Sequence, residues 1–314
     1  MAVHTPMLRY LVKRLLWMLV VLLGVITITF ALTYLMPGDP ARRIGGSGAS
    51  IDTIRNIRHQ LGLDLPFWVQ YTRYLGAVLH GDFGYSYLQN VPVLPTILAR
   101  FPVTAQLAVG GLFVELLIGL PTGIISAYRR GKVIDRIAML FALGGVSAPP
   151  FWLGLVLLYY FAFTIAIFPI GGYGDPAIRY MILPCFTLGV GGAAIYTRIF
   201  RSTILDVLEQ PYIRMARAKG LSERYILLRH VIPNAITPIV TQIGIDLGYF
   251  LGGAFIIEQA YALPGVGKQA IDAIGQLDIP IILGTVLFAA VLIVVSNIIV
   301  DMSYALIDPR VRYR

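Results

Sequence analysis

Six apolar stretches decide what this chain can fold into. They cover residues 15–36, 101–128, 137–170, 180–200, 233–257 and 279–300, and a helix needs roughly 20 apolar residues to cross a membrane. Hydrophobic residues make up 57% of the chain and charged residues 13%, and the mean hydropathy is +0.77. This composition excludes an ordinary soluble domain. We therefore predict an all-α polytopic membrane protein with six transmembrane helices.

The third stretch, 137–170, is longer than one straight span needs, because a helix rises about 1.5 Å per residue. Pro149 and Pro150 lie within it, and proline interrupts helical hydrogen bonding. We expect a kink there. Two separate spans on either side of these prolines would put seven basic residues outside the cell, and we reject that alternative.

The distribution of basic residues predicts the orientation of the chain. Lysine and arginine accumulate in cytoplasmic segments, and 17 of the 25 basic residues fall in the N-terminal arm, residues 128–136, residues 198–229 and the C-terminal tail. Six spans place these four segments on one side, so we predict that both termini are cytoplasmic. The net charge of +9 then reflects topology and contact with anionic lipid headgroups, and it does not indicate nucleic-acid binding.

The spans and loops divide the chain into four parts. They are the cytoplasmic arm with the first span (1–36), an extracytoplasmic helical segment (37–100), a five-helix transmembrane core with a cytoplasmic loop at 201–232 (101–301), and a cytoplasmic tail (302–314).

The extracytoplasmic segment contains two predicted helices. Apolar spacing indicates one over 51–61, which Gly62 can cap, and Pro66 can open a second that runs through His80. The second carries an aromatic face that could lie in the membrane interface, meet an external partner or pack as part of an aromatic belt. Its members are Trp68, Tyr71, Tyr74 and Leu75.

A polar segment at 212–233 interrupts the apolar stretches on the cytoplasmic side. It reads as a short basic helix over 212–219, a stop or left-handed turn at Gly220, a second short helix, and Pro233 where the next span begins. Because the stretches before and after it are predicted to lie in the membrane, this polar segment is the place where a soluble partner could bind. Arg214, Arg217 and Lys219 could offer charge-assisted hydrogen bonds to carboxylates of such a partner.

Two acidic residues lie inside predicted spans, where a charge is expensive. Glu115 is the only charged residue of 101–128, and Asp246 lies within 233–257. They could line a translocation pathway and meet a cationic or zwitterionic substrate, or they could hydrogen-bond neighbouring helices or a partner subunit. Glu258, at the outer end of its span, is expected to be solvated.

Other functional classes find less support in the residues. A stand-alone ion-coupled carrier would use Glu115 and Asp246 as proton or cation sites. An intramembrane enzyme would need a nucleophile and a base on facing spans, and no such pair can be named. The four histidines are scattered, so no metal site is predicted. Residues 262–269 resemble a phosphate-binding loop but lack its first glycine and its Ser or Thr.

Several motifs follow one another along the chain. They are LVKRLL before the first span, LMPGDPA at 35–41, QLGLDLPFWVQY at 60–71, HGDFGYS at 80–86, ARAKGLS at 216–222 and ALIDPRVRY at 305–313. On these motifs the chain resembles the inner-membrane permease subunits of bacterial ATP-binding-cassette importers, and more narrowly the dipeptide, oligopeptide, nickel and glutathione branch. The resemblance covers essentially the whole chain and implies the type I importer permease fold in the bacterial cytoplasmic membrane.

The resemblance also implies an ATPase-coupling loop. In the family this loop reads E-A-A-x-x-x-G, followed after twelve residues by Pro; Gly220 and Pro233 match with that spacing, and Ala216 matches the second Ala. Arg214 stands in place of the Glu and Met215 in place of the first Ala, so a salt bridge by the family's Glu is not carried over. The implied coupling residues are Arg214, Ala216, Arg217, Ala218, Gly220 and Leu221.

The resemblance further implies the partners of a non-catalytic subunit. They are a second, similar permease, two cytoplasmic ATPase subunits and an extracytoplasmic substrate-binding protein. ATP and Mg²⁺ would be bound by the ATPases, and no cofactor or metal by this chain. The expected function is half of a translocation pore for di- or oligopeptides or a related small solute.

Overall fold

The computed structural model describes residues 4–35 and 38–307. Residues 1–3 of the predicted arm, 36–37 of the LMPGDPA motif and 308–314 of the predicted tail lie outside this description. Within the described residues the regular structure is helical, and the β pairing is one isolated bridge between Tyr85 and Pro92. The chain divides into two compact units, one of residues 1–104 and 264–294, the other of residues 105–263 and 295–314.

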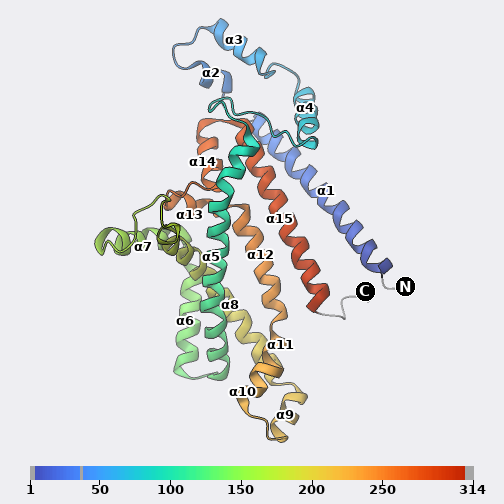
Figure 1. Ribbon diagram of the computed structural model, residues 1–314, viewed down its shortest axis with the longest axis vertical. Coiled ribbons are helices and arrows are strands. Elements are labelled where there is room, and N and C mark those ends of the chain that lie inside the picture. Colours follow the sequence, from blue (N-terminus) through green and yellow to red (C-terminus); the bar gives the residue numbers. More distant parts are fainter. Residues whose placement is uncertain (1–3, 36–37, 308–314) are drawn as a thin grey trace. The chain divides into compact units, whose positions relative to one another are not determined.

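The first unit contains the predicted extracytoplasmic helices (Figure 1). Its elements are α1 (His4–Leu35), α2 (Pro40–Gly45), α3 (Ile51–Gln60), α4 (Phe67–Leu79), the beginning of α5 (Val93–Tyr128), α14 (Val266–Gln276) and the first half of α15 (Ile279–Ile307). The helices predicted over 51–61 and from Pro66 are present as α3 and α4. Gly62 ends α3 with a φ of +66°, and the N–H of Leu63 donates to the carbonyl of Arg58, which is the C-capping geometry that favours glycine.

The aromatic face of α4 packs on the outer end of α1. The Phe30 ring stacks on Tyr74 with centroids 5.8 Å apart and meets Tyr71 edge-on at 5.5 Å. The hydroxyls of Thr27 and Tyr71 are hydrogen-bonded at 2.7 Å. Tyr71 and Tyr74 therefore serve packing within the chain, whereas Trp68 keeps 70% of its surface exposed.

A buried polar contact ties the turn after α4 to the start of α15. The hydroxyl of Ser86, which is fully buried, donates to Oδ2 of Asp278. Burial raises the pKa of the Asp278 carboxyl above its ordinary value. The pair joins residues that are 192 positions apart in sequence, so it fixes the predicted extracytoplasmic segment to the start of α15.

The second unit holds the remaining helices. They are the rest of α5, α6 (Val133–Ser147), α7 (Pro150–Leu157), a π-helical turn η1 (Leu158–Thr164), α8 (Ala177–Leu208), α9 (Pro211–Ala218), α10 (Glu223–Ile226), a π-helical turn η2 (Leu227–Val231), α11 (Ile232–Ala235), α12 (Thr237–Gly253), α13 (Phe255–Ala260) and the end of α15. α6 runs alongside α8, and α9 and α10 form one end of the unit (Figure 1).

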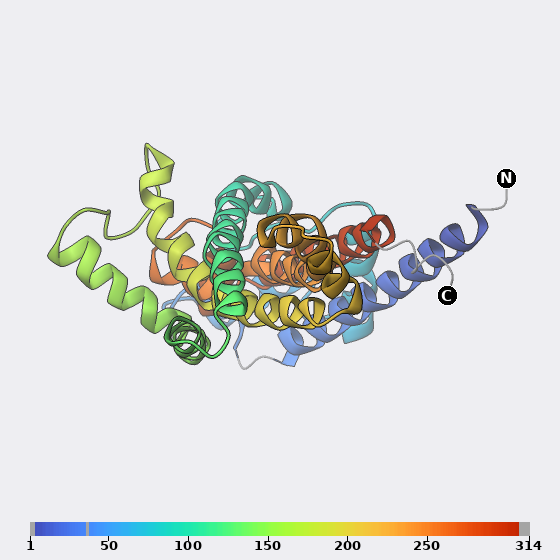
Figure 2. The same cartoon turned by 90° about the horizontal axis from the view of Figure 1, so that it is seen from below.

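The bend at the prolines of the third apolar stretch is much larger than the kink that was expected there. The segments Val133–Gly145 and Pro150–Thr164 meet at 101°, and α6 and α7 run in clearly different directions (Figures 1 and 2). Neither Pro149 nor Pro150 has an N–H to continue the helix, and the residue before a proline is kept out of the helical region. At about 22 Å, the 15-residue α6 is shorter than the hydrocarbon core, so the stretch is at most one broken span.

Length and apolar character give between four and six crossings within the described residues. Four helices suffice alone: Leu16–Leu35, Val93–Tyr128, Ala177–Leu208 and Ile279–Ile299. Two bent pairs complete the count of six if each is one span: the pair around Pro149, and Glu223–Ala235 with Thr237–Gly252, which meet at 51°. The predicted number of six is the upper value of this range.

Candidate coupling loop and intramembrane carboxylates

The cytoplasmic loop predicted at 212–233 forms two short helices joined by a glycine turn. Pro211 opens α9 at a position where no N–H is needed. Gly220 ends α9 with a φ of +77°, its own N–H donates to the Arg217 carbonyl at 2.9 Å, and the N–H of Leu221 donates to the Ala216 carbonyl at 3.3 Å. This bond pattern needs a left-handed residue after the helix, so the glycine sets the direction in which α10 leaves.

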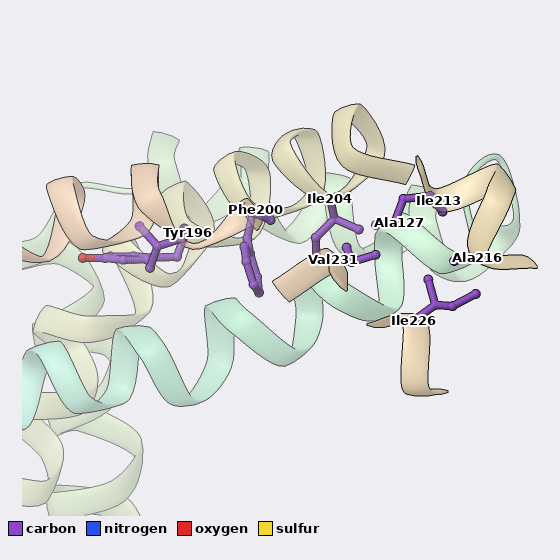
Figure 3. Close-up of a cluster of buried hydrophobic side chains, with 10 residues drawn as sticks. Ala127, Tyr196, Phe200, Ile204, Ile213, Ala216, Ile226 and Val231 are labelled. Atoms are coloured by element: carbon purple, nitrogen blue, oxygen red, sulfur yellow. The ribbon is translucent and has the colours of Figure 1, made fainter. Parts of the chain in front are cut away.

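One face of the loop packs into the protein's own core. Ile213 and Ile226 are completely buried and Ala216 is 8% exposed. Figure 3 shows these side chains gathered with residues of α5, α8 and η2. The whole cluster comprises Ala127, Tyr196, Phe200, Ile204, Ile213, Ala216, Ile226, Val231, Ala235 and Ile239. Because α8 and α12 both contribute to it, the loop is fixed to two membrane helices.

The other face of the loop points to solvent and mixes basic with apolar residues. Of the six predicted coupling residues, Ala216 lies on the inner face, and the other five, Arg214, Arg217, Ala218, Gly220 and Leu221, are exposed. Large apolar side chains accompany them: Met215 is 61% exposed, Tyr225 49% and Leu228 56%. We call this exposed surface of α9, the Gly220 turn, α10 and the start of η2 the outer face of the loop. Sequence reasoning missed its apolar part. The available signal was Met215, which does not share the helical spacing that puts Ile213 and Ala216 on the same side of α9.

Arg217 is already paired within the loop. Its Nε donates to Oε1 of Glu223 at 2.6 Å, and its Nη2 donates to Oε2 at 3.2 Å. Both residues are about half exposed, so the pair braces α9 against α10 with little net stabilisation. Arg214 makes only a long contact of 3.4 Å to the Glu209 carbonyl. Arg214 therefore stays available to a partner, whereas Arg217 would have to exchange Glu223 for it.

A second ion pair holds α8 to the first turn of α6. Arg201 donates through Nε and Nη2 to the two oxygens of Asp135 at 2.7 and 2.8 Å. Asp135 also accepts from the Ser126 hydroxyl and from the N–H of Gly131. Its side chain is 6% exposed and that of Arg201 23%, so the pair is largely desolvated. Sequence reasoning did not single out this pair. The feature that could have revealed it is the single acid, Asp135, among the four basic residues of 128–136.

Asp246 is hydrogen-bonded to its neighbours. The Tyr196 hydroxyl of α8 donates to Oδ2 at 2.8 Å, and the Gln242 amide, one turn away on α12, donates to Oδ1 at 2.9 Å. The bond from Tyr196 joins α8 to α12. This agrees with the alternative in which Asp246 hydrogen-bonds a neighbouring helix. A place in the translocation pathway remains a prediction.

Glu115 is buried where α5 passes very close to α8. It is 1% exposed, and its Oε2 has no hydrogen-bond partner in the described part of the chain. Gly192 lies directly opposite, so that a Cβ atom at that position would come within 1.6 Å of Oε1. Glu115 therefore occupies the space that the missing side chain of Gly192 leaves.

This contact predicts different effects for two neighbouring glycines. We expect Gly192→Ala to destabilise the protein by about 1–3 kcal/mol, the usual range for overpacking, because the Glu115 side chain must leave its place. Gly191→Ala is the matched control, since its Cβ would meet only the Gly145 carbonyl, at 3.9 Å. Thermal unfolding in detergent measures both variants. Adding Glu115→Ala to Gly192→Ala should restore stability; an equal loss in both glycine variants contradicts the proposed contact.

Glu258 does not behave as expected from its position. It was predicted to be solvated, and it is fully buried. It lies on α13, which begins after the break of α12 at Ala254 and packs against α7 and α8. The predicted end of the fifth span, at residue 257, was therefore wrong, because no proline marks the break in the helix.

Comparison with known proteins places the chain in a family. The model of the binding-protein-dependent transport system inner membrane component matches residues 119–313, and the model of the N-terminal part of such membrane components matches residues 7–108. The chain belongs to this family. It is a permease subunit of an ATP-binding-cassette importer and a multi-pass protein of the bacterial inner membrane.

Relatives match this permease along its whole length. It is 39% identical over 308 residues to the glutathione transport system permease protein GsiC of Salmonella paratyphi A, covering 98% of this chain and all of the relative. It is 37% identical, with the same coverage, to GsiC of Escherichia coli K12. The resemblance to the glutathione-containing branch is confirmed. The alternative of a stand-alone carrier finds no support in these relatives.

A solved structure supports the fold of this permease. A chain of the MetNI methionine ABC transporter, solved in inward-facing conformations, superimposes with a TM-score of 0.56 over 69% of this chain and 98% of its own, at 18% identity. The fold is thus that of an importer permease, and the chain is a non-catalytic membrane subunit that works with ATPase and substrate-binding partners. Among the described residues, no group of three or more His, Cys, Asp or Glu is placed to hold a metal.

Proposed function

We propose that this permease forms one half of a heterodimeric pore with a second, similar permease, with six spans and both termini in the cytoplasm. Two ATPase subunits dock from the cytoplasm, and one binding protein delivers substrate from outside. The observation that carries the proposal is the loop of α9, Gly220 and α10, which has an inner face fixed to the core and a basic, apolar outer face.

The outer face suits a groove on a carboxylate-bearing ATPase. Exposed Met215 and Leu221 would supply buried apolar area, and Arg214 a charge-assisted hydrogen bond. ATP and Mg²⁺ are bound and ATP is hydrolysed on the ATPases, and this chain contributes no cofactor. When the ATPases close, the loop moves with them, and α8 and α12 follow because the same cluster holds all three. The cavity between the two permeases then opens alternately to either side.

The substrate class we propose is small peptides, with glutathione as the first to test. The support is the name of the relatives, which are glutathione transport permeases and match the whole chain. Uptake of labelled glutathione and of labelled dipeptides, compared in cells with and without the importer, distinguishes the two. Glu115 and Asp246 remain candidates for the pathway, although their contacts in the structure are to helices of this chain.

Purification of the tagged chain in mild detergent tests the proposed assembly. We expect two ATPase subunits and a second permease to co-purify and to be identified by mass spectrometry. Met215→Asp should release the ATPases, since a charge at this exposed apolar side chain opposes its burial in a groove. The second permease should stay bound.

Arg136→Asp is the matched control for this experiment. Arg136 is also exposed, lies on α6 outside the loop, and changes the charge by more than Met215→Asp does. It should retain the ATPases. A chain that purifies alone or only with copies of itself, under conditions that keep other importers intact, would contradict the proposal.

A further inference from the structure

One side of α12 carries polar side chains that the chain's own helices leave partly uncovered. Gln242, Asp246 and Tyr249 follow one another at helical spacing, which places them along the same side of the helix. Tyr249 is 65% exposed, and Ile245, next to Asp246 in the chain, is 53% exposed. Gln242 and Asp246 are partly buried. Because α12 lies in the fifth predicted span, this polar side belongs to the membrane part of the chain.

Asp246 keeps both a charge and acceptor sites for a further partner. The Tyr196 hydroxyl donates to Oδ2, and the Gln242 amide donates to Oδ1. A carboxylate offers about four acceptor sites, so each oxygen keeps one after these two bonds. Both donors are neutral, α12 contains no basic residue, and the ion pairs among the described residues do not include Asp246.

The position of Asp246 in the membrane restricts what that partner can be. Hydrocarbon is an expensive neighbour for a carboxylate, so the exposed side of α12 faces water, a solute or another protein. A cation satisfies both the charge and the open acceptor sites, and an ammonium group donates charge-assisted hydrogen bonds to them. The Tyr249 ring, one turn further along α12, offers a face that attracts the same group.

The second intramembrane acid, Glu115, is closed to a solute. It is 1% exposed, and its Oε1 fills the space in front of Gly192. A solute would reach this carboxylate only if α5 and α8 separated. Of the two acids, Asp246 is therefore the one that lies at an accessible surface.

We propose that Asp246 binds the amino group of the solute on its way through the pore. The ammonium group donates to the open acceptor sites of the carboxylate and lies against the Tyr249 ring, while Tyr196 and Gln242 hold the carboxylate in place. This site rests on the proposed function, because it takes the polar side of α12 as pore wall and a small peptide as the solute. It gives the permease a selectivity of its own, for solutes with a free amino group.

A cysteine beside Asp246 tests the charge of this surface directly. Cys185, the chain's single cysteine, is buried, so Ile245→Cys adds one exposed thiol. The complete importer in lipid vesicles is treated with cationic aminoethyl or anionic sulfonatoethyl methanethiosulfonate, and mass spectrometry measures modification of residue 245. We expect the cationic reagent to react faster. Adding Asp246→Asn should lower the ratio of the two rates about tenfold, because a nearby full charge is removed, and Asp246→Glu should preserve the ratio.

Phe113→Cys is the matched control. Phe113 is 62% exposed on an apolar side of α5, between Val109 and Leu117, which hydrocarbon can cover, so its thiol should react with neither reagent. The proposal is overturned if the thiol of Ile245→Cys reacts with neither reagent, or if Asp246→Asn leaves the ratio of rates unchanged. Equal reaction at both positions would also overturn it, because reactivity would then not mark a pore.

Uptake separates this site from the proposed function. Asp246→Asn should lower the saturated uptake rate of labelled dialanine about tenfold, the loss expected for one charge-assisted hydrogen bond, at an unchanged unfolding temperature. Asp52→Asn, which alters an acid that is 87% exposed on α3, should not lower it. Failure of the wild type to take up peptides or glutathione would refute the proposed substrate class and the amine site with it. Normal peptide uptake by Asp246→Asn would refute the amine site alone.

Discussion

Replacing Gly220 by valine should lower substrate uptake at least tenfold while the permease still inserts into the membrane. At a φ of +77° a residue with a Cβ is strained by about 1–2 kcal/mol, and a β-branched residue is a poor occupant of this region. The space around Gly220 is open, so the effect comes from the backbone alone. Relief of the strain turns α10 away from α9 and distorts the outer face of the loop. Transport assays and immunoblots of membranes measure the two expectations.

Two matched variants separate docking from general strain. Gly220→Asn should keep most of the uptake, because asparagine tolerates the left-handed region. Gly46→Val places the same residue at a φ of +76° and a ψ of 172°, a region open essentially to glycine alone, also in open space but in the predicted extracytoplasmic segment, so it carries strain without touching the loop. It should transport far better than Gly220→Val. Normal uptake by Gly220→Val, or an equal loss in Gly46→Val, would refute the role of this turn in coupling.

Breaking the ion pair of Asp135 and Arg201 should be the most destabilising single change. Asp135→Ala leaves the largely desolvated Arg201 without its partner, and such losses cost about 3–5 kcal/mol. It also removes the acceptor of the Gly131 N–H. We expect a clear drop in unfolding temperature in detergent and a loss of protein in the membrane.

The exposed pair of Arg130 and Glu209 provides the control for this experiment. These side chains are 62% and 69% exposed and 3.1 Å apart, so Arg130→Gln should cost less than about 1 kcal/mol. A double variant, Asp135→Ala with Arg201→Met, removes both charges and should recover much of the lost stability. If Asp135→Ala proves no more harmful than Arg130→Gln, the pair does not hold α8 in place.

Local patterns predicted the helices and turns well. Gly62 and Gly220 were recognised as ends of helices because their chemistry is local: the residues just after a helix donate to carbonyls of its last turn. The two short helices on either side of Gly220 were located for the same reason, and their role in coupling remains a prediction. The 101° bend at Pro149 and Pro150 was underestimated, because a proline pair marks an interruption but does not set its angle.

Contacts between distant residues could not be predicted from one sequence. Nothing in the neighbourhood of Arg201 points to Asp135, 66 residues earlier, and nothing around Glu115 points to Gly192. The inner position of Ala216 follows from Ile204 and Ile226 packing against the same face, which requires the tertiary arrangement. Burial of Glu258 likewise depends on the break of α12 at Ala254.

The two faces of α9 differ in how freely their side chains can be substituted. Ile213 and Ala216 are held by the interior, where a change of volume is costly, whereas Arg214, Met215 and Ala218 contact solvent in the isolated chain. Substitutions on the outer face can therefore accumulate without loss of folding. A permease built this way could be adapted to a different ATPase by changing a few exposed side chains, and chimaeric importers could be assembled by exchanging that surface alone.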